Sequence, residues 1–481
     1  MHLIPQSWSH LHILVSVFPS VGLAFVLAAF VVAMNTGNEL MKRTCLVLFG
    51  ILGILAIPTY FSGDGSAATL ANNPRFPQNM VDAHYGWSMA ALTVLVLLGI
   101  ASFYELWRFS KLGRLSNDML NLVLGLAIAT LALMVVCGEL GWEINHIELR
   151  AVLQKAAGGA SASDIPDNTQ TPQAWSHFHM ILNHFPTVGL VISLAIFITA
   201  LVKNNEGMQR TGLTLLTLCA ILGIPTYVTG AAAMWAISEI KEITTHAAGQ
   251  DPLVNAHRDM ALATLFGLAF TGIAAWIELW RYRYLGRFSR RSLNLVLIFS
   301  LITLAIMAET GHRGGQINHP EIRTEPVPTD ITGYLSPYVE NMINNVIWFV
   351  PWQTIHFFGY SIVFGVVTAV VLRIFGFWKS MPFSAVHRLL PLGVFGVTMN
   401  IFTGMLMLMA DTFRYVNETT FIPKMFLLPI GASAVLYFSL NDALWATKAN
   451  EDAPMQAKWF AALLLIAWTG VIMGGRLLPY V

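Results

Sequence analysis

The sequence predicts an all-α integral membrane protein with about twelve transmembrane helices, arranged as three consecutive four-helix bundles. Its composition is the first reason: 56% of the 481 residues are hydrophobic and only 11% are charged, whereas soluble domains carry about 25% charged residues. The second reason is a series of apolar runs, each long enough for the roughly 20 residues that a membrane span needs. The formal net charge of +1 gives no reason to expect nucleic-acid binding, so the lipid bilayer is the first predicted partner.

The first two bundles are predicted to be parallel copies of one another. The segment Trp8-Ser9-His10-Leu11-His12 recurs as Trp175-Ser176-His177-Phe178-His179, a step of 167 residues (175 − 8). Two further motifs recur at a step of 173 residues (257 − 84): Ala83-His84 with Ala256-His257, and Glu105-Leu106-Trp107-Arg108 with Glu278-Leu279-Trp280-Arg281. Because the motifs recur in the same order at the same places in the helix pattern, the two copies should have the same orientation in the membrane.

The repeats and the polar stretches between them predict the domain bounds. Residues 1–150 form repeat one and residues 175–323 form repeat two. Residues 342–481 form a divergent third four-helix bundle, which has the same layout but few of the histidines. The polar stretches 151–174 and 324–341 are predicted to be linkers on the periplasmic face.

Basic residues predict the orientation of the helices. They concentrate in the connections after helices one and three of each repeat, and connections of this kind usually stay in the cytoplasm. The chain is therefore expected in a bacterial inner membrane, with both termini in the periplasm. The basic residues in question are Lys42, Arg43, Arg108, Lys111, Arg114, Lys203, Arg210, Arg281, Arg283, Arg287, Arg290 and Arg291.

Most of the histidines are predicted to gather at the outer end of the first two bundles. In an up-and-down bundle, the starts of helices one and three lie at the same membrane face as the ends of helices two and four. Polar groups in or near hydrocarbon are costly and are usually kept for function, so these histidines are candidate ligands. They are His10, His12, His84 and His146 in repeat one, and His177, His179, His184, His246, His257, His312 and His319 in repeat two.

A b-type haem held by two histidines fits this arrangement. Such a haem takes one imidazole from each of two helices on opposite sides of the porphyrin. In repeat two, His184 and His257 have suitable depths, and Gly230 on helix two has no side chain to prevent close approach. His177 and His179 are further candidates, of which only one can face the bundle centre because residues two apart on a helix point about 200° apart. The three cysteines include no C-x-x-C-H motif, which excludes covalent c-type haem.

Repeat one lacks one of these predicted ligands. The position equivalent to His184 is Val17 (184 − 167). His10 or His12 would therefore have to pair with His84, closer to the membrane surface. The sequence thus predicts one or two haems, with the stronger candidate site in repeat two.

Copper or zinc held by three or four imidazoles is the alternative chemistry. The candidate metal ligands, for this site or for haem iron, are His12, His84, His146, His184, His257 and His319. A third interpretation is that a histidine at a helix end is an interfacial residue that hydrogen-bonds to backbone or water. The recurrence of helix, depth and register in both repeats favours a ligand role.

Two arginines close the repeats and are candidate cofactor-binding residues. Arg150 follows His146-Ile147-Glu148-Leu149, and Arg323 follows His319-Pro320-Glu321-Ile322. Either guanidinium could pair with haem propionates, which point to the polar face and gain from charge-assisted hydrogen bonds. A surface pair between the arginine and the nearby glutamate is the alternative.

Repeat two resembles a widespread class of small four-helix bacterial membrane domains. These domains carry a His-Phe-Pro motif on helix one, a histidine that opens helix three and a glycine-rich ending. The matching residues are His184-Phe185-Pro186, His257 and Gly314-Gly315-Gln316-Ile317-Asn318-His319. The resemblance covers the two repeats and implies binding of haem b in the neighbourhood of respiratory proteins. Repeat one departs from it at Val17 and at Trp142, and the third bundle is similar to another four-helix family through His356-Phe357-Phe358-Gly359.

These features predict a b-type cytochrome-like subunit of a respiratory or electron-transfer complex. Haem near the outer face would exchange electrons between the quinone pool and a periplasmic cytochrome or dehydrogenase, with other subunits of a membrane redox complex as partners. Quinone is the second candidate cofactor. No catalytic residue is assigned, because the chain contains no soluble catalytic domain; a non-catalytic and a quinol-oxidoreductase subunit both remain open.

A cofactor-free scaffold or assembly subunit of a larger membrane complex is the alternative function. A transporter fits less well, because many transporters have inverted repeats and broken helices. The repeats here are parallel, and no charged residue is evident in the middle of a span.

Overall fold

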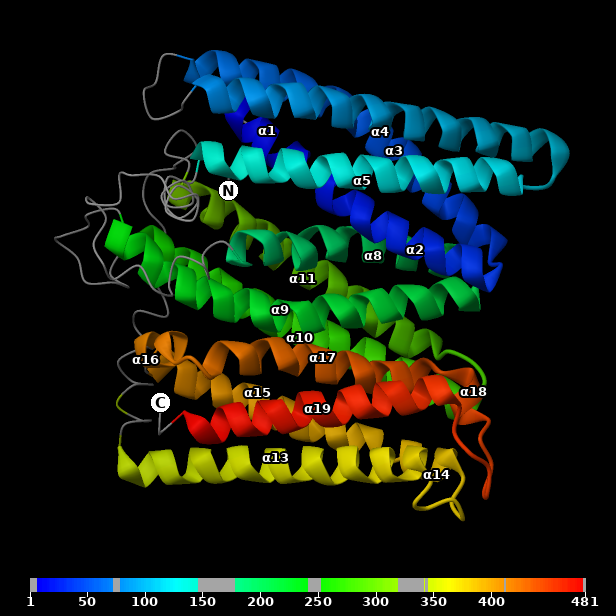
Figure 1. The fold of residues 1–481 in the computed structure, drawn as a ribbon, viewed down its shortest axis with the longest axis vertical. Helices are drawn as coiled ribbons and strands as arrows, with labels where there is room; N and C mark the ends of the chain where they lie inside the picture. Colours follow the sequence, from blue (N-terminus) through cyan, green and yellow to red (C-terminus); the bar gives the residue numbers. More distant parts are fainter. Residues whose placement is uncertain are drawn as a thin grey trace. The chain divides into compact units, whose positions relative to one another are not determined.

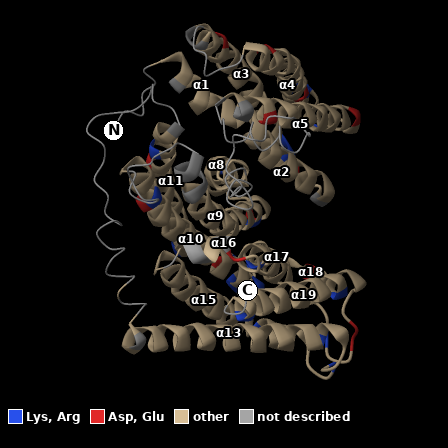
Figure 2. Cartoon of the chain, turned by 60° about the vertical axis from the view of Figure 1, so that its left-hand side comes forward, with Lys and Arg blue, Asp and Glu red and all other residues tan. Residues whose placement is uncertain are grey.

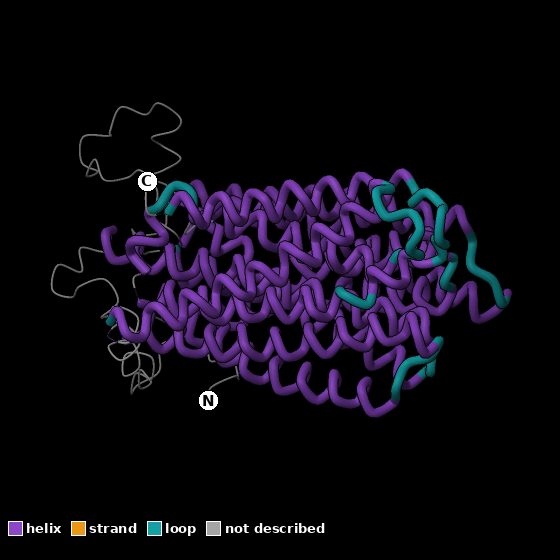
Figure 3. Tube along the Cα trace, turned by 90° about the horizontal axis from the view of Figure 1, so that it is seen from below, coloured by secondary structure: helices purple, strands orange, loops and turns teal. Residues whose placement is uncertain are grey.

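The computed structural model describes residues 7–71, 78–145, 178–240, 252–318, 341, 345–410 and 412–478 (Figure 1). These ranges form helices joined by short loops and contain no strand (Figure 3). Twelve helical segments within them are long and apolar enough to cross a membrane, and few Lys, Arg, Asp or Glu residues lie along the helices (Figure 2). The prediction of an all-α, multi-pass membrane protein is therefore confirmed.

The described helices follow the predicted order. Repeat one contains α1 (Trp8–Val17), η1 (Phe18–Gly22), α2 (Leu23–Thr36), α3 (Glu39–Leu70), α4 (Gln78–Leu112) and α5 (Asn117–Asn145). Repeat two contains the short helix 178–182, α8 (His184–Val202), α9 (Glu206–Ile240), α10 (Pro252–Leu285) and α11 (Arg290–Asn318). The third bundle contains α13 (Val346–Phe375), α14 (Phe383–His387), α15 (Leu390–Ala410), α16 (Thr412–Asn417), α17 (Phe421–Leu440), α18 (Asp442–Trp445) and α19 (Met455–Leu477).

The internal repeat is visible in the helix bounds. Helices α5 and α11 begin and end at equivalent positions, and α4 and α10 also end at equivalent positions. The first helix of each repeat is also interrupted near the equivalent proline, by the π-helical segment η1 in repeat one and by a turn at Asn183 in repeat two. Pro19 and Pro186 explain both interruptions, because proline has no N–H and its ring clashes with the carbonyl four residues earlier.

Two compact units divide the chain, and their boundaries cut through repeat two. The first unit comprises Met1–Gln173, Asn183–Cys219 and Leu297–Val327, and the second comprises Ala174–Leu182, Ala220–Val296 and Pro328–Val481. Helices α9 and α11 therefore contribute to both units. The domain bounds predicted from the sequence stay a prediction.

Within the first unit, α3, α4 and α5 lie side by side (Figure 1), and the first helices of the two repeats meet. Asn38 caps α3 by accepting a hydrogen bond from the Met41 backbone N–H, and Asn205 accepts the equivalent bond from Met208. The Asn38 amide also donates to Asn205 Oδ1 at 3.5 Å. A two-fold arrangement brings the same patch of both copies together, and this contact between equivalent residues points to a local pseudo-two-fold between the repeats.

Within the second unit, α13, α15, α17 and α19 form the third four-helix bundle (Figure 1). Arg373 lies at the end of α13 and is fully buried. Its guanidinium donates to the backbone carbonyls of Met381, Lys448 and Glu451 at 2.5, 3.0 and 3.3 Å. One side chain thus holds the loop after α13 and the loop before α19 at the same end of the bundle.

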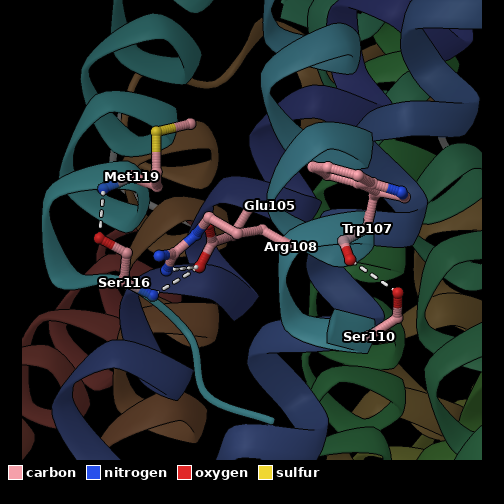
Figure 4. Close-up of polar contacts among 6 residues, drawn as sticks. All are labelled: Glu105, Trp107, Arg108, Ser110, Ser116 and Met119. Carbon is pink, nitrogen blue, oxygen red and sulfur yellow. Dashed lines mark hydrogen bonds and ion pairs between the residues drawn. The ribbon is translucent and has the colours of Figure 1, made fainter. Parts of the chain in front are cut away.

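A buried glutamate holds the loop between helices three and four in each repeat. Glu105 is fully buried; it pairs with Arg108 at 2.7 Å and accepts a 2.5 Å hydrogen bond from the Ser116 backbone N–H (Figure 4). In repeat two, Glu278 is likewise buried, pairs with Arg281 and accepts from the Ser289 N–H. The repeated Glu-Leu-Trp-Arg motif therefore has a structural role: its carboxylate satisfies a free N–H group at the start of the next helix.

Replacing Glu105 by alanine is expected to lower the free energy of unfolding by about 2 kcal/mol, because hydrogen bonds to charged groups contribute about 1.5–3 kcal/mol. Glu105→Gln, which keeps one acceptor oxygen, should lose less. Thermal unfolding of the full chain in detergent measures both effects. The exposed Glu39 at the start of α3 provides the control substitution, Glu39→Ala. Equal losses of unfolding free energy for Glu105→Ala and Glu39→Ala would contradict the proposal that Glu105 holds the loop between α4 and α5.

Candidate functional site

Two histidines of repeat two lie close together within the second unit. His179 lies in the short helix 178–182, and His257 lies in the second turn of α10. Their ring centroids are 6.4 Å apart, and the planes of the rings are inclined by 70°. Both side chains are half-buried. Helices one and three of this repeat therefore bring two imidazoles together. The residue from helix one is His179 and not His184.

A backbone carbonyl fixes the orientation of the His179 ring. The Nδ1 atom of His179 lies 3.0 Å from the carbonyl oxygen of Thr226 on α9. A carbonyl can only accept, so this hydrogen bond requires the proton on Nδ1 and leaves the lone pair of a neutral imidazole on Nε2. Histidines that bind metals commonly have this arrangement, with one nitrogen bonded to a carbonyl and the other facing the metal.

Gly230 provides the space for the His179 ring. A Cβ atom at Gly230 would lie 2.7 Å from His179 Cε1 and 3.0 Å from Nδ1, closer than such atoms approach in proteins. The sequence analysis assigned Gly230 to close approach of a porphyrin. In the structure, an imidazole lies against this glycine.

Repeat one has the same carbonyl and glycine contacts around its helix-one histidine, His12. His12 Nδ1 lies 3.2 Å from the Thr59 carbonyl oxygen, which is equivalent to that of Thr226, and a Cβ at Gly63 would lie 3.0 Å from His12 Cε1. His84, the equivalent of His257, is close enough to His12 for their electrostatic interaction to be significant. His12 and His84 are thus the repeat-one counterparts of His179 and His257.

His84 is oriented in the same way as the helix-one histidines. Its Nδ1 atom lies 3.1 Å from the carbonyl oxygen of Cys137 on α5. A Cβ at Gly141, one turn further along α5, would lie 3.0 Å from His84 Cε1. Each of the two histidines of repeat one therefore has a backbone carbonyl at Nδ1 and a glycine against its ring.

The third bundle keeps the helix-one histidine but has a different residue on helix three. His356 Nδ1 lies 2.8 Å from the Thr403 hydroxyl. The two residues are 47 positions apart, the same separation as between His12 and Thr59. On helix three, Lys424 on α17 interacts electrostatically with His356. The sequence predicts few histidines in this bundle, and its pattern gives no sign of Lys424.

Other predicted ligands are placed only in part. His184 is the first residue of α8, directly after the turn at Asn183, and is half-buried; its pairing with His257 stays a prediction. His10 lies in α1, and nothing is described of its side chain. Outside the described residues lie His146, His177, His319, Arg150 and Arg323.

The copper or zinc alternative also stays a prediction. The described part of the chain contains no group of three or more His, Cys, Asp or Glu residues that could hold a metal ion. Two of the candidate ligands for that site, His146 and His319, lie outside the described ranges.

Sequence reasoning also missed two buried polar features of α10. Asp259 is only 6% exposed and follows His257 by two residues. At the other end of the helix, Trp280 stacks on the ring of His387 from α14, with centroids 6.3 Å apart, and the Tyr284 hydroxyl lies 3.0 Å from His387 Nδ1. The sequence feature that could have identified Asp259 is a carboxylate near the start of an apolar helix. His387 has no such feature, because its partners are distant in the sequence.

Comparison with protein families gives a match for repeat two. A family described as "Predicted membrane protein (DUF2231)" matches residues 176–320. The match includes all four helices of repeat two, together with His179, Gly230 and His257. No curated protein and no solved structure matches the chain. The resemblance of repeat two to a family of membrane domains is therefore confirmed, and the description of that family names no cofactor.

Proposed function

We propose that His179 and His257 bind the iron of one b-type haem. The separation of their rings is the observation that carries this proposal. A metal–imidazole bond is about 2.0 Å long, and the nitrogen lies about 1.1 Å from its ring centre, so two imidazoles on opposite sides of one metal ion have centroids about 6 Å apart. The observed separation of 6.4 Å fits this value. The Nδ1 bond to the Thr226 carbonyl places the lone pair of a neutral His179 ring on Nε2, the atom that we propose binds the iron.

A second haem is proposed between His12 and His84 in repeat one. Both histidines have Nδ1 bonded to a backbone carbonyl and a glycine against the ring, as His179 has. The lack of a histidine at Val17 does not weaken this site, because the repeat-two ligand on helix one is His179. The expected stoichiometry is therefore two haems per chain.

Two histidine ligands favour electron transfer over catalysis at the iron. Both imidazoles would be used to hold the iron, so the bound haem would supply one-electron transfer rather than oxygen or substrate chemistry. The protein's part is to orient the imidazoles and to exclude water with apolar helices. We therefore propose an electron-transfer subunit of a membrane redox complex in a bacterial inner membrane. It would exchange electrons between the quinone pool and a periplasmic cytochrome or dehydrogenase.

The first test is the cofactor content of the purified full-length protein. The expected result is a Soret band, a reduced α-band and iron in a two-to-one ratio to the protein. Copper or zinc in place of iron would support the alternative metal site. A correctly folded protein with no bound metal or haem would contradict the proposal and favour the scaffold function.

Gly230→Val is expected to displace the His179 ring and to weaken haem binding in repeat two by about 10- to 100-fold, the usual effect of disturbing the groups that orient a metal ligand. Gly311→Val is the matched control, because Gly311 is also helical and a Cβ there meets no atom within 4 Å. Haem content per folded protein is the measurement. Equal haem contents in the two variants would show that Gly230 does not position His179.

A further inference from the structure

The third bundle contains a cation without a counter-ion. Lys424 lies in the first turn of α17 and is half-buried. Among the described residues, no carboxylate forms an ion pair with it and no acceptor forms a hydrogen bond with it; a ring contact with Phe421 at 6.0 Å is its nearest cation–π partner. Charged residues within membrane spans are costly and mark binding sites.

Two further polar groups lie around Lys424. The Thr420 hydroxyl, one turn earlier on the same face of the helix, is buried and has no hydrogen-bond partner in the described structure. His356 on α13 interacts electrostatically with Lys424. The Thr403 hydroxyl donates to the Met399 carbonyl, so it accepts from His356 Nδ1–H, and Nε2 of His356 is left as an acceptor.

Glycines of α19 leave room beside these groups. A Cβ at Gly475 would lie 3.3 Å from Lys424 Nζ, and a Cβ at Gly474 would lie 3.0 Å from Lys424 Cβ and 3.1 Å from the Thr420 carbonyl oxygen. Any larger residue at these positions would press against the lysine. The ammonium, the free hydroxyl and the imidazole acceptor thus lie at one end of the bundle.

We propose that the third bundle binds a phosphate group between Lys424 and His356. The ammonium and the Thr420 hydroxyl would donate to anionic oxygens of the phosphate, and His356 Nε2 would accept from a hydroxyl that the ligand carries. The phosphate supplies the negative charge that the described residues lack. A phospholipid headgroup and free inorganic phosphate both offer this chemistry. The proposal does not depend on haem binding in the two repeats.

Thermal unfolding of the full-length protein tests the proposal. The wild type is measured in nanodiscs of phosphatidylcholine alone, in nanodiscs that also contain phosphatidylglycerol, and in detergent with added inorganic phosphate against chloride at equal ionic strength. A site filled at several times its Kd should raise the Tm by about 2–4 °C. A rise with phosphatidylglycerol only identifies a lipid headgroup, and a rise with inorganic phosphate identifies a free anion.

The variants distinguish this site from general effects of charge. Lys424→Met and Gly475→Val, which removes the space at Nζ, should both lose the rise, whereas Lys424→Arg should retain it. Lys448→Met is the matched control because Lys448 is an exposed lysine at the other end of the bundle. No rise in the wild type under any condition, or an equal rise in Lys424→Met, would overturn the proposal.

Discussion

Substituting alanine for His179 or for His257 is expected to remove about half of the bound haem, because each variant lacks one of the two proposed iron ligands in repeat two. The two rings lie 6.4 Å apart, so one haem would need both of them, since loss of an axial ligand leaves the iron held from one side only. The haem proposed for repeat one should remain, because His12 and His84 are not altered. Haem content per folded protein and the Soret absorbance of each variant are the measurements.

Two control variants make this result specific. His356→Ala removes a half-buried histidine from the third bundle, and we expect it to leave the haem content unchanged. His184→Ala tests the pairing that the sequence alone favoured. If His184→Ala lost half of the haem while His179→Ala lost none, the assignment of His179 as the ligand would be wrong.

Arg373→Met is expected to cause the largest loss of stability in the third bundle, about 3 kcal/mol or more. The guanidinium is fully buried and donates to three backbone carbonyls, and each hydrogen bond to a charged group contributes about 1.5–3 kcal/mol. Methionine fills similar space but cannot donate to the three carbonyls, of which the Lys448 carbonyl still accepts from the Glu451 backbone N–H. Thermal or denaturant unfolding of the full chain, followed by tryptophan fluorescence, measures the loss.

Lys379→Met is the matched control for Arg373→Met. Lys379 pairs with Asp452 at 2.8 Å near the same loops, but both side chains are largely exposed. The Lys379 ammonium holds the pKa of Asp452 below its ordinary value, so this pair stabilises the fold at neutral pH and less as the pH falls through that lowered pKa. Exposed pairs contribute little. A loss in Lys379→Met as large as in Arg373→Met would contradict the role given to the buried arginine.

Much of the fold follows from patterns that are local in the sequence. Apolar runs and the repeated motifs located the helices, because span length and repeat spacing are visible without tertiary contacts. The repeated Glu105 and Glu278 were visible for the same reason. Their role was not, because it depends on the Ser116 and Ser289 N–H groups, which reach the carboxylate only when the loop folds back.

The site was predictable at the level of helices but not of the individual residue. His179 and His184 are five positions apart, which on a continuous helix places them about 140° apart. The turn at Asn183 and the carbonyl of Thr226, 47 residues away, orient His179 toward His257. Neither can be derived from the spacing of the histidines. Lys424 was missed for a related reason: its electrostatic interaction with His356 joins two helices, α13 and α17, that are distant in the sequence.

The most direct test of the central claim is an electron paramagnetic resonance spectrum of the oxidised protein. Two axial imidazoles give low-spin iron, and rings inclined by 70° should give a strongly anisotropic low-spin signal. We expect that signal in the wild type and a weaker one in His179→Ala and His257→Ala. A high-spin iron signal, or a low-spin signal that both variants retain in full, would contradict the claim that these two histidines bind one haem.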